Sequence, residues 1–359
     1  MRYRVVDGGV LVEEGVEKAI GEVDAIVFDC DGTLADVSPS LHLLGRLISA
    51  ILLDRVYGVD CRIGEDYDEA FHLLKMLGGF NNVKNAISIL MQVIILGMED
   101  PKPARADPGE IEDLEYYLGR LRKGGSRPAF IERSLKWVKE RCLNMLGSYA
   151  TKHDLEELIL RRAEAEGKLE QLRELRSLIE PVAPYGRKIL GTLYRELWLG
   201  SEGIEKRHGV KPRYYRGAGL IEEERILARE EVLEELRSLV PKGLGIISGR
   251  GSWEVRRTLN PILKYFDLEA SVFTGDRASG MEKPNPASLL ECCSKLGARK
   301  VLYVGDAGED LFLTRNASRK GLRAYLAGLL TNRYSYTFFT KCGAEAILEN
   351  VNQLPKLFK

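Results

Sequence analysis

The sequence has few of the residues from which metal and redox centres are usually built. It contains 4 histidines and 6 cysteines in 359 residues; the histidines show no metal-ligand spacing, and the cysteines form no CxxC pair. A zinc site or a disulfide framework is therefore poorly supported, and we expect the cysteines to be small core residues in a reducing, cytoplasmic compartment. The sequence also lacks a GxxxxGK[ST] loop, which argues against nucleoside triphosphate use of the Walker type.

Neither sign of charge predominates, and long apolar runs are absent. Lys+Arg and Asp+Glu both total 53, so no overall field attracts nucleic acid or an acidic membrane. The N-terminus shows no basic region followed by an apolar core, and we expect no signal peptide. The longest apolar stretch, residues 86–98, is too short to span a bilayer and is predicted to be a buried helix. We therefore expect no membrane partner.

The segment from Ala25 to Leu34 carries the clearest chemical signal. It reads AIVFDCDGTL, an apolar run that ends in two carboxylates followed by a Gly-Thr turn. Alternate residues of a strand share a face, so Asp29 and Asp31 can converge on one object at the strand end. One carboxylate can attack phosphorus and the other can act as general acid and base, but two anions facing an anionic substrate need Mg²⁺ or a similar hard cation. A plain turn after a strand is the alternative interpretation.

This segment resembles the first motif of the haloacid dehalogenase-like hydrolase superfamily, and three later segments resemble its other motifs in the same order. They are LGIISGR at 244–250, EKP at 282–284 and VLYVGDAGED at 301–310. Each later segment alone is also typical of a loop or a surface lysine, but the ordered set is specific. The resemblance implies catalytic roles for Asp29, Asp31, Ser248 and Lys283, phosphate binding by Gly32, Thr33, Ser248, Gly249 and Lys283, and Mg²⁺ binding by Asp29, the backbone carbonyl of Asp31, Asp306 and Asp310.

The spacing of these motifs predicts two domains. The gap between Asp31 and Leu244 exceeds most whole domains and is rich in helical patterns. Strands and helices alternate after it, which favours a parallel sheet, and residues 3–12 read as a hairpin. We therefore predict an α/β fold with a Rossmann-like, doubly wound parallel sheet as its core (residues 1–37 and 221–359) and an inserted all-α cap (38–220). The predicted cap helices are 39–57, 67–77, 83–96, 111–123, 128–146, 151–180 and 184–206, and the predicted linkers are 34–39 and 216–220, with Gly217 and Gly219 as hinges.

A narrower resemblance concerns the cap. The segments LADVS at 34–38, KMLGGFNN at 75–82, GLIE at 219–222 and KPNP at 283–286 resemble a phosphatase-like subgroup labelled as related to imidazoleglycerol-phosphate dehydratase. The sequence departs from that pattern at Leu41-His42 and at residues 82–85, both in expected specificity elements, so its substrate can differ. The loop 78–82 is expected to face the site, with a plain turn and an Asn helix cap as the alternative. The cap residues expected to contact substrate are His42, Arg46, Asn81 and Asn82.

Together these features predict a Mg²⁺-dependent phosphatase that hydrolyses a small phosphorylated metabolite through an aspartyl-phosphate intermediate. A phosphomutase uses the same pair of acids and stays open as an alternative, whereas a dehalogenase has no leaving alcohol for Asp31 to protonate. Basic and aromatic residues at 206–216 suggest a nucleic-acid end phosphatase as a further alternative, although a solvated loop is the simpler interpretation of this segment. An inactive partner-binding protein using helix 153–178 is disfavoured because both acids are retained. The cap helices could also form a homodimer.

Overall fold

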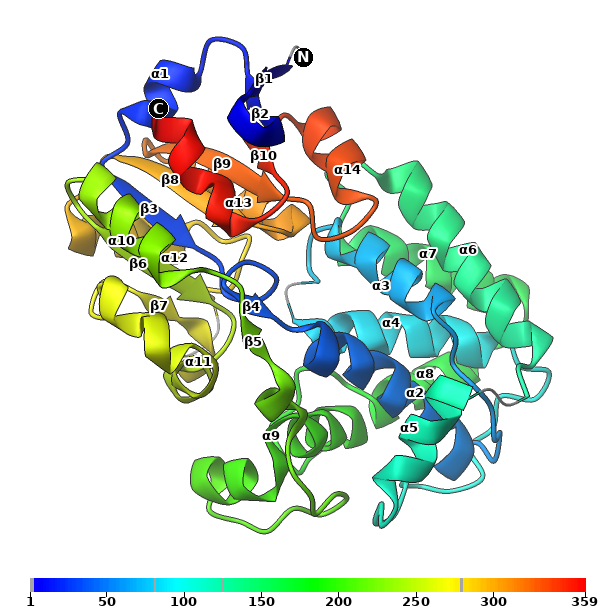
Figure 1. The fold of residues 1–359 in the computed structure, drawn as a ribbon. Helices are drawn as coiled ribbons and strands as arrows, with labels where there is room; N and C mark the ends of the chain where they lie inside the picture. Colours follow the sequence, from blue (N-terminus) through cyan, green and yellow to red (C-terminus); the bar gives the residue numbers. More distant parts are fainter. Residues whose placement is uncertain (1–2, 81, 124–125, 278–279) are drawn as a thin grey trace.

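The computed structural model describes residues 3–80, 82–123, 126–277 and 280–359. Within them, an eight-stranded sheet has the order β1-β2-β10-β9-β8-β3-β6-β7 (Figure 1). The strands from β10 to β7 are parallel, and the β1–β2 hairpin joins antiparallel to β10, which confirms the α/β class and the hairpin. The bounds are β1 Tyr3–Val6, β2 Val10–Glu13, β3 Ala25–Phe28, β6 Leu244–Ser248, β7 Val272–Phe273, β8 Lys300–Gly305, β9 Arg323–Leu329 and β10 Ala346–Leu348.

Helices cover the sheet, which explains why its central strands read as continuous apolar runs. All four residues of β3 are buried, and β3 lies between β8 and β6. All six cysteines are buried and free, as expected for core residues. The helices that flank the sheet are α1 Glu17–Gly21, α10 Glu230–Leu239, α11 Ser252–Leu259, α12 Ala287–Leu296, α13 Gly308–Ser318 and α14 Ser335–Cys342.

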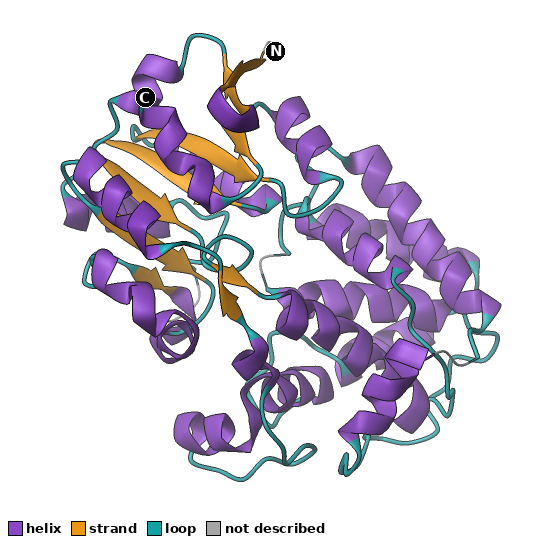
Figure 2. Cartoon of the chain, viewed as in Figure 1, coloured by secondary structure: helices purple, strands orange, loops and turns teal. Residues whose placement is uncertain are grey.

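A helical segment separates the first sheet strands from the rest. The chain leaves the sheet through β4 (Ala35–Asp36) and returns through β5 (Arg225–Ile226), and these two short strands pair antiparallel. Figure 2 shows this half of the molecule as almost entirely helical. No helix of the described residues is long and apolar enough to cross a membrane. The segment contains the π-helical turn η2 Ser38–His42, α2 Leu43–Arg55, α3 Asp66–Lys75, α4 Val83–Leu96, α5 Leu114–Lys123, α6 Ala129–Met145, α7 Lys152–Ala165, α8 Leu169–Leu178, α9 Ile189–His208 and the 3₁₀ turn η3 Leu220–Glu223.

The apolar stretch near residue 90 forms the centre of this segment. Helix α4 has the predicted bounds and buries nearly all of its side chains, including the polar Ser88 and Gln92. Its neighbours α2, α3, α6, α8 and α9 pack around it. The prediction of a buried helix is thus confirmed.

One local prediction was wrong. The single helix expected over 151–180 is broken between α7 and α8, because Gly167 adopts φ +68°, a left-handed conformation that ends a helix. At the predicted linker, Gly219 lies in closely packed backbone, and the hinge role of Gly217 and Gly219 stays a prediction. A Cβ on Gly219 would lie 2.4 Å from the backbone of Leu199, next to the kink that Gly200 makes in α9 with φ +67°.

Candidate active site

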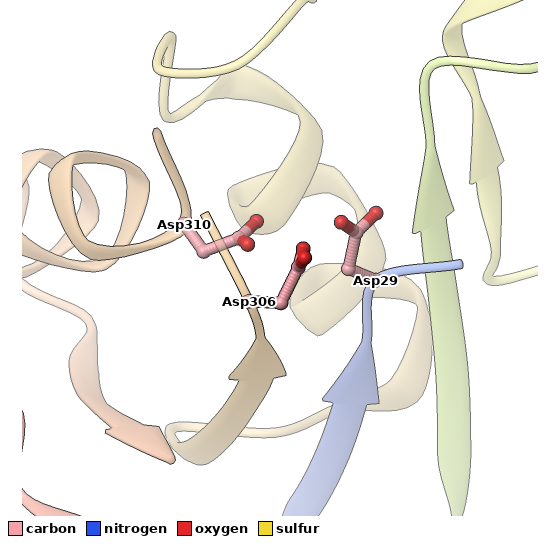
Figure 3. A group of neighbouring side chains, drawn as sticks. All are labelled: Asp29, Asp306 and Asp310. Atoms are coloured by element: carbon pink, nitrogen blue, oxygen red, sulfur yellow. The ribbon is translucent and has the colours of Figure 1, made fainter. Parts of the chain in front are cut away.

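The predicted core residues meet beyond the carboxyl ends of three neighbouring parallel strands, where ligands bind in sheets of this type. Asp29 directly follows β3, Ser248 is the last residue of β6, and Asp306 directly follows β8. Asp310 lies in the first turn of α13, and Lys283 comes from the loop between β7 and α12. Figure 3 shows the carboxylates of Asp29, Asp306 and Asp310 gathered beyond the two strand ends.

Lys283 holds the predicted nucleophile in place. Its Nζ lies 2.7 Å from Asp29 Oδ1 and donates a 2.7 Å hydrogen bond to Asp310 Oδ1. Burial raises the pKa of Asp29 to about 7, although the Lys283 charge opposes this. Burial alone would lower the pKa of Lys283, but the carboxylates of Asp29 and Asp310 raise it well above its usual value. Lys283 therefore carries its charge between two buried acids.

The acidic cluster has the donor set of a hard divalent cation. Asp29, Asp306 and Asp310 each offer a carboxylate oxygen, and these oxygens lie within 4.8 Å of one another. Both oxygens of Asp310 already have protein partners, because the second one accepts a 2.9 Å hydrogen bond from Ala307 N. Asp306 Oδ1, in contrast, is buried and has no hydrogen-bond partner among the described residues. All-oxygen ligands with an unsatisfied buried carboxylate oxygen fit Mg²⁺.

The turn after β3 brings the phosphate-binding candidates next to these acids. Gly32 has φ +77°, and a Cβ there would lie 2.4 Å from Asp306 Oδ2, so the turn requires glycine. Thr33 is fully buried, and its hydroxyl has no partner among the described residues. On the neighbouring strand, the Ser248 hydroxyl accepts a 3.1 Å hydrogen bond from Arg250 N, and Gly249 between them is exposed.

The predicted acid and base, Asp31, is held by an arginine that sequence reasoning missed. Arg250 Nε donates a 2.6 Å hydrogen bond to Asp31 Oδ1. The other side of the guanidinium donates to both carboxylate oxygens of Glu224, at 2.6 and 3.0 Å. The Arg250 and Glu224 side chains are 2% and 0% exposed, so this ion pair is fully desolvated.

Glu224 connects this ion pair to the helical segment. It accepts hydrogen bonds from Ser40 in η2 at 2.6 Å and from Trp198 in α9 at 3.2 Å. The Arg250 guanidinium also lies 5.0 Å from the centre of a Trp198 ring. Arg250 stands two residues after Ser248 in a segment that the sequence singled out, but nothing in the sequence indicated its partner.

A cavity of about 20 Å³ separates the acids from the helical segment. Its lining includes Asp29 and Asp31 on one side and His42, Lys75 and Val83 on the other. This is about the space of one water molecule, so little room is left between the acids and the helical segment.

Lys75, a residue that sequence reasoning did not assign, reaches across the cavity from α3. Its Nζ lies 3.2 Å from Asp306 Oδ2, and the Asp306 charge raises the pKa of Lys75 against the effect of burial. Next to it, burial and the Lys75 charge lower the pKa of His42 well below its usual value, and burial lowers that of His72 to about 4. Both imidazoles are therefore neutral near pH 7.

The remaining helical-segment candidates have structural partners. Arg46 forms an ion pair with Asp68 at 3.4 Å and is not among the described residues that line the cavity. The Asn82 side chain accepts from Lys84 N at 3.1 Å and caps α4, so this residue follows the alternative interpretation of an Asn-capped turn. Asn81 lies outside the described residues. The loop before them contacts the sheet domain through Gly79 N, which donates a 2.5 Å hydrogen bond to Glu309 Oε1.

The fold and the site define an α/β protein with a buried cluster of carboxylates beyond the ends of parallel strands. A model of the haloacid dehalogenase-like hydrolase family matches residues 23–317, most of the chain. The chain belongs to this family, and the match includes the helical segment.

The chain is also similar to solved structures at low sequence identity. A phosphatase, Tt82 from Thermococcus thioreducens, is 18% identical, with coverage of 92% of this chain and 97% of that chain and a TM-score of 0.48. A predicted phosphoglycolate phosphatase from Haemophilus somnus 129pt is 15% identical, with coverage of 94% and 98% and a TM-score of 0.40. No curated protein matches the chain.

Proposed function

We propose that this protein is a phosphoric monoester hydrolase that forms an aspartyl-phosphate on Asp29. The observation that carries the proposal is the buried Asp29 carboxylate, fixed by Lys283 at a strand end beside two further buried acids. Burying several carboxylates together costs folding free energy. A site that transfers a phosphoryl group requires such a cluster. The substrate class is a small phosphorylated metabolite.

Each residue of the site has a role in that reaction. Asp29 attacks phosphorus in line, Asp31 protonates the leaving oxygen, and Asp31 then removes a proton from the water that hydrolyses the aspartyl-phosphate. The Ser248 hydroxyl and the Lys283 ammonium stabilise the equatorial phosphoryl oxygens. Asp310 keeps Lys283 oriented. Phosphate leaves, and Asp29 is restored as a carboxylate.

Mg²⁺ is the cation that the acidic cluster fits. Asp29, Asp306 and the backbone carbonyl of Asp31 would hold it, and Asp310 would orient these ligands. When bound, it would neutralise charge between the carboxylates and the phosphoryl group.

The test is phosphate release from a panel of phosphorylated metabolites and p-nitrophenyl phosphate with Mg²⁺. Asp29→Asn should remove activity, and Asp36→Asn, a nearby carboxylate outside the cavity lining, should retain it. Acid quenching should trap phosphate on the wild type, and mass spectrometry should locate it on Asp29. Activity without a trapped phosphoryl group, or an active Asp29→Asn variant, would contradict the mechanism. The appearance of an isomerised phosphate ester instead of free phosphate would identify a phosphomutase.

A further inference from the structure

The last residue of α3 places a positive charge inside the acidic site. Lys75 Nζ donates a 3.2 Å hydrogen bond to Asp306 Oδ2, and the two side chains are 13% and 4% exposed. Lys75 also lines the cavity together with Asp29 and Asp31. Burial alone would lower the pKa of this lysine, but the charges of these three acids raise it, that of Asp306 most. The ammonium therefore lies in the field of both acids that are proposed to react.

The backbone that follows Lys75 is packed directly against the sheet domain. A Cβ on Gly308, the first residue of α13, would lie 2.4 Å from the backbone oxygen of Met76. Gly79 N donates its hydrogen bond to Glu309 in the same turn of α13. These contacts hold the end of α3 beside the turn that follows β8, where the metal-ligand candidates lie. The position of the Lys75 charge is therefore fixed by the close contact between the helical segment and α13.

The two carboxylate oxygens of Asp306 have different surroundings. Oδ2 accepts hydrogen bonds from Lys75 and, at 3.1 Å, from Thr331 Oγ1. Oδ1 is buried without a hydrogen-bond partner among the described residues, and it is the oxygen open to a metal ion. A divalent cation on this carboxylate would repel the nearby ammonium and weaken its ion pair, because like charges repel strongly in a buried site. Lys75 would then need another anion, and a phosphoryl group at Asp29 would lie in the cavity that Lys75 lines.

We propose that Lys75 is a further catalytic residue, which pairs with Asp306 in the metal-free site and with an oxygen of the phosphoryl group when Asp306 holds Mg²⁺. The inference rests on the proposed function, because the phosphoryl group must bind at Asp29 to meet this lysine. It has two consequences of opposite sign. Removal of the Lys75 charge should strengthen the binding of Mg²⁺ alone, and it should weaken the binding of phosphate to the Mg²⁺-loaded protein. The helical segment then supplies one of the charges that stabilise phosphoryl transfer.

The experiment is calorimetric titration of MgCl₂ into the metal-free protein and of inorganic phosphate into the protein with saturating Mg²⁺, both at one ionic strength. Lys75→Met should bind Mg²⁺ at least about tenfold more tightly than the wild type and phosphate at least about tenfold more weakly. Lys75→Gln also lacks the charge, so it should show the same two changes, and it replaces the first variant if that one does not fold. The control Arg333→Met breaks another ion pair between α3 and the sheet domain, the exposed one with Glu69, and it should leave both affinities unchanged.

The opposite signs distinguish this role from a structural one, because a damaged site would bind both ligands more weakly. An affinity for Mg²⁺ that is unchanged or lower in the Lys75 variants would overturn the proposal, and so would an unchanged affinity for phosphate. Hydrolysis assays separate this failure from failure of the proposed function. If the wild type hydrolyses no phosphate ester but the two affinities shift in opposite directions, the phosphatase proposal fails and the exchange of partners by Lys75 stands. If it hydrolyses esters and neither affinity shifts, the exchange alone is refuted.

Discussion

Replacing Lys84 by methionine should make the protein more stable at neutral pH, because the substitution removes a buried charge that forms no ion pair with a carboxylate among the described residues. Lowering the pKa of Lys84 from 10.5 to about 8 corresponds to about 3 kcal/mol of lost folding stability. The contact of the Lys84 ammonium with the Tyr194 ring compensates for about 0.5–2 kcal/mol of this cost in the wild type. Methionine has a similar length and fills the same space. Lys84→Met should therefore be more stable than the wild type by about 1–2 kcal/mol at pH 7.

The stability difference between the wild type and Lys84→Met should change with pH in one direction. Because the pKa of Lys84 is lower in the folded state, the unfolded state binds more protons between pH 8 and 10.5. Wild-type stability relative to the variant should then rise with pH across this interval, and the advantage of Lys84→Met should be largest below pH 8. Urea unfolding of both proteins at several pH values measures the difference directly.

A less stable Lys84→Met variant at pH 7, or a difference that does not change with pH, would refute the reasoning. Lys295→Met serves as the control, since Lys295 is exposed and paired with Glu291. It should show no gain in stability at pH 7.

The remaining predictions concern catalysis and the fold. A chelator should abolish phosphate release and Mg²⁺ should restore it, whereas Ca²⁺, which prefers more ligands at longer distances, should inhibit; full activity in excess chelator would contradict this. Arg250→Lys should reduce kcat/KM for alkyl phosphates more than for p-nitrophenyl phosphate, because a poor leaving group depends more on a correctly placed Asp31. The control Arg257→Lys alters an exposed ion pair with Glu222 and should change kcat/KM little for both substrates. Equal losses would give Arg250 a purely structural role. Gly167→Ala should lower stability by about 1 kcal/mol at its φ of +68°, whereas Gly119→Ala, in open space inside α5, should raise it; thermal unfolding checks both signs.

The parts of the fold that could be predicted are those whose signal is local. The apolar runs that became β3, β6 and β8 end in the predicted site residues, and α4 has the predicted bounds. The break between α7 and α8 was missed because the charged and leucine residues keep a helical spacing on both sides of Gly167. A glycine inside such a pattern can lie in a helix or end it, and the tertiary packing decides.

The parts of the site that were missed are pairings between distant segments. Arg250 meets Glu224 and Asp31, and Lys75 meets Asp306, only after the chain has folded. No spacing rule relates these positions. Asn82 makes a local capping interaction at α4, which the sequence indicated as the alternative to substrate contact, and the substrate contact stays a prediction.

The pairing of β4 with β5 shows how the helical segment could be deleted from the chain. The two strands lie side by side and antiparallel, which is how the ends of a hairpin are arranged, so a tight turn could connect Asp36 to Arg225 and remove every helix between them. That deletion would also remove Glu224 and Trp198, which cover the Arg250 guanidinium in this structure, and leave Asp31 as its remaining acidic partner. In the shortened protein the Arg250–Asp31 pair would therefore be open to solvent, and it would hold Asp31 in place less firmly than in the full chain.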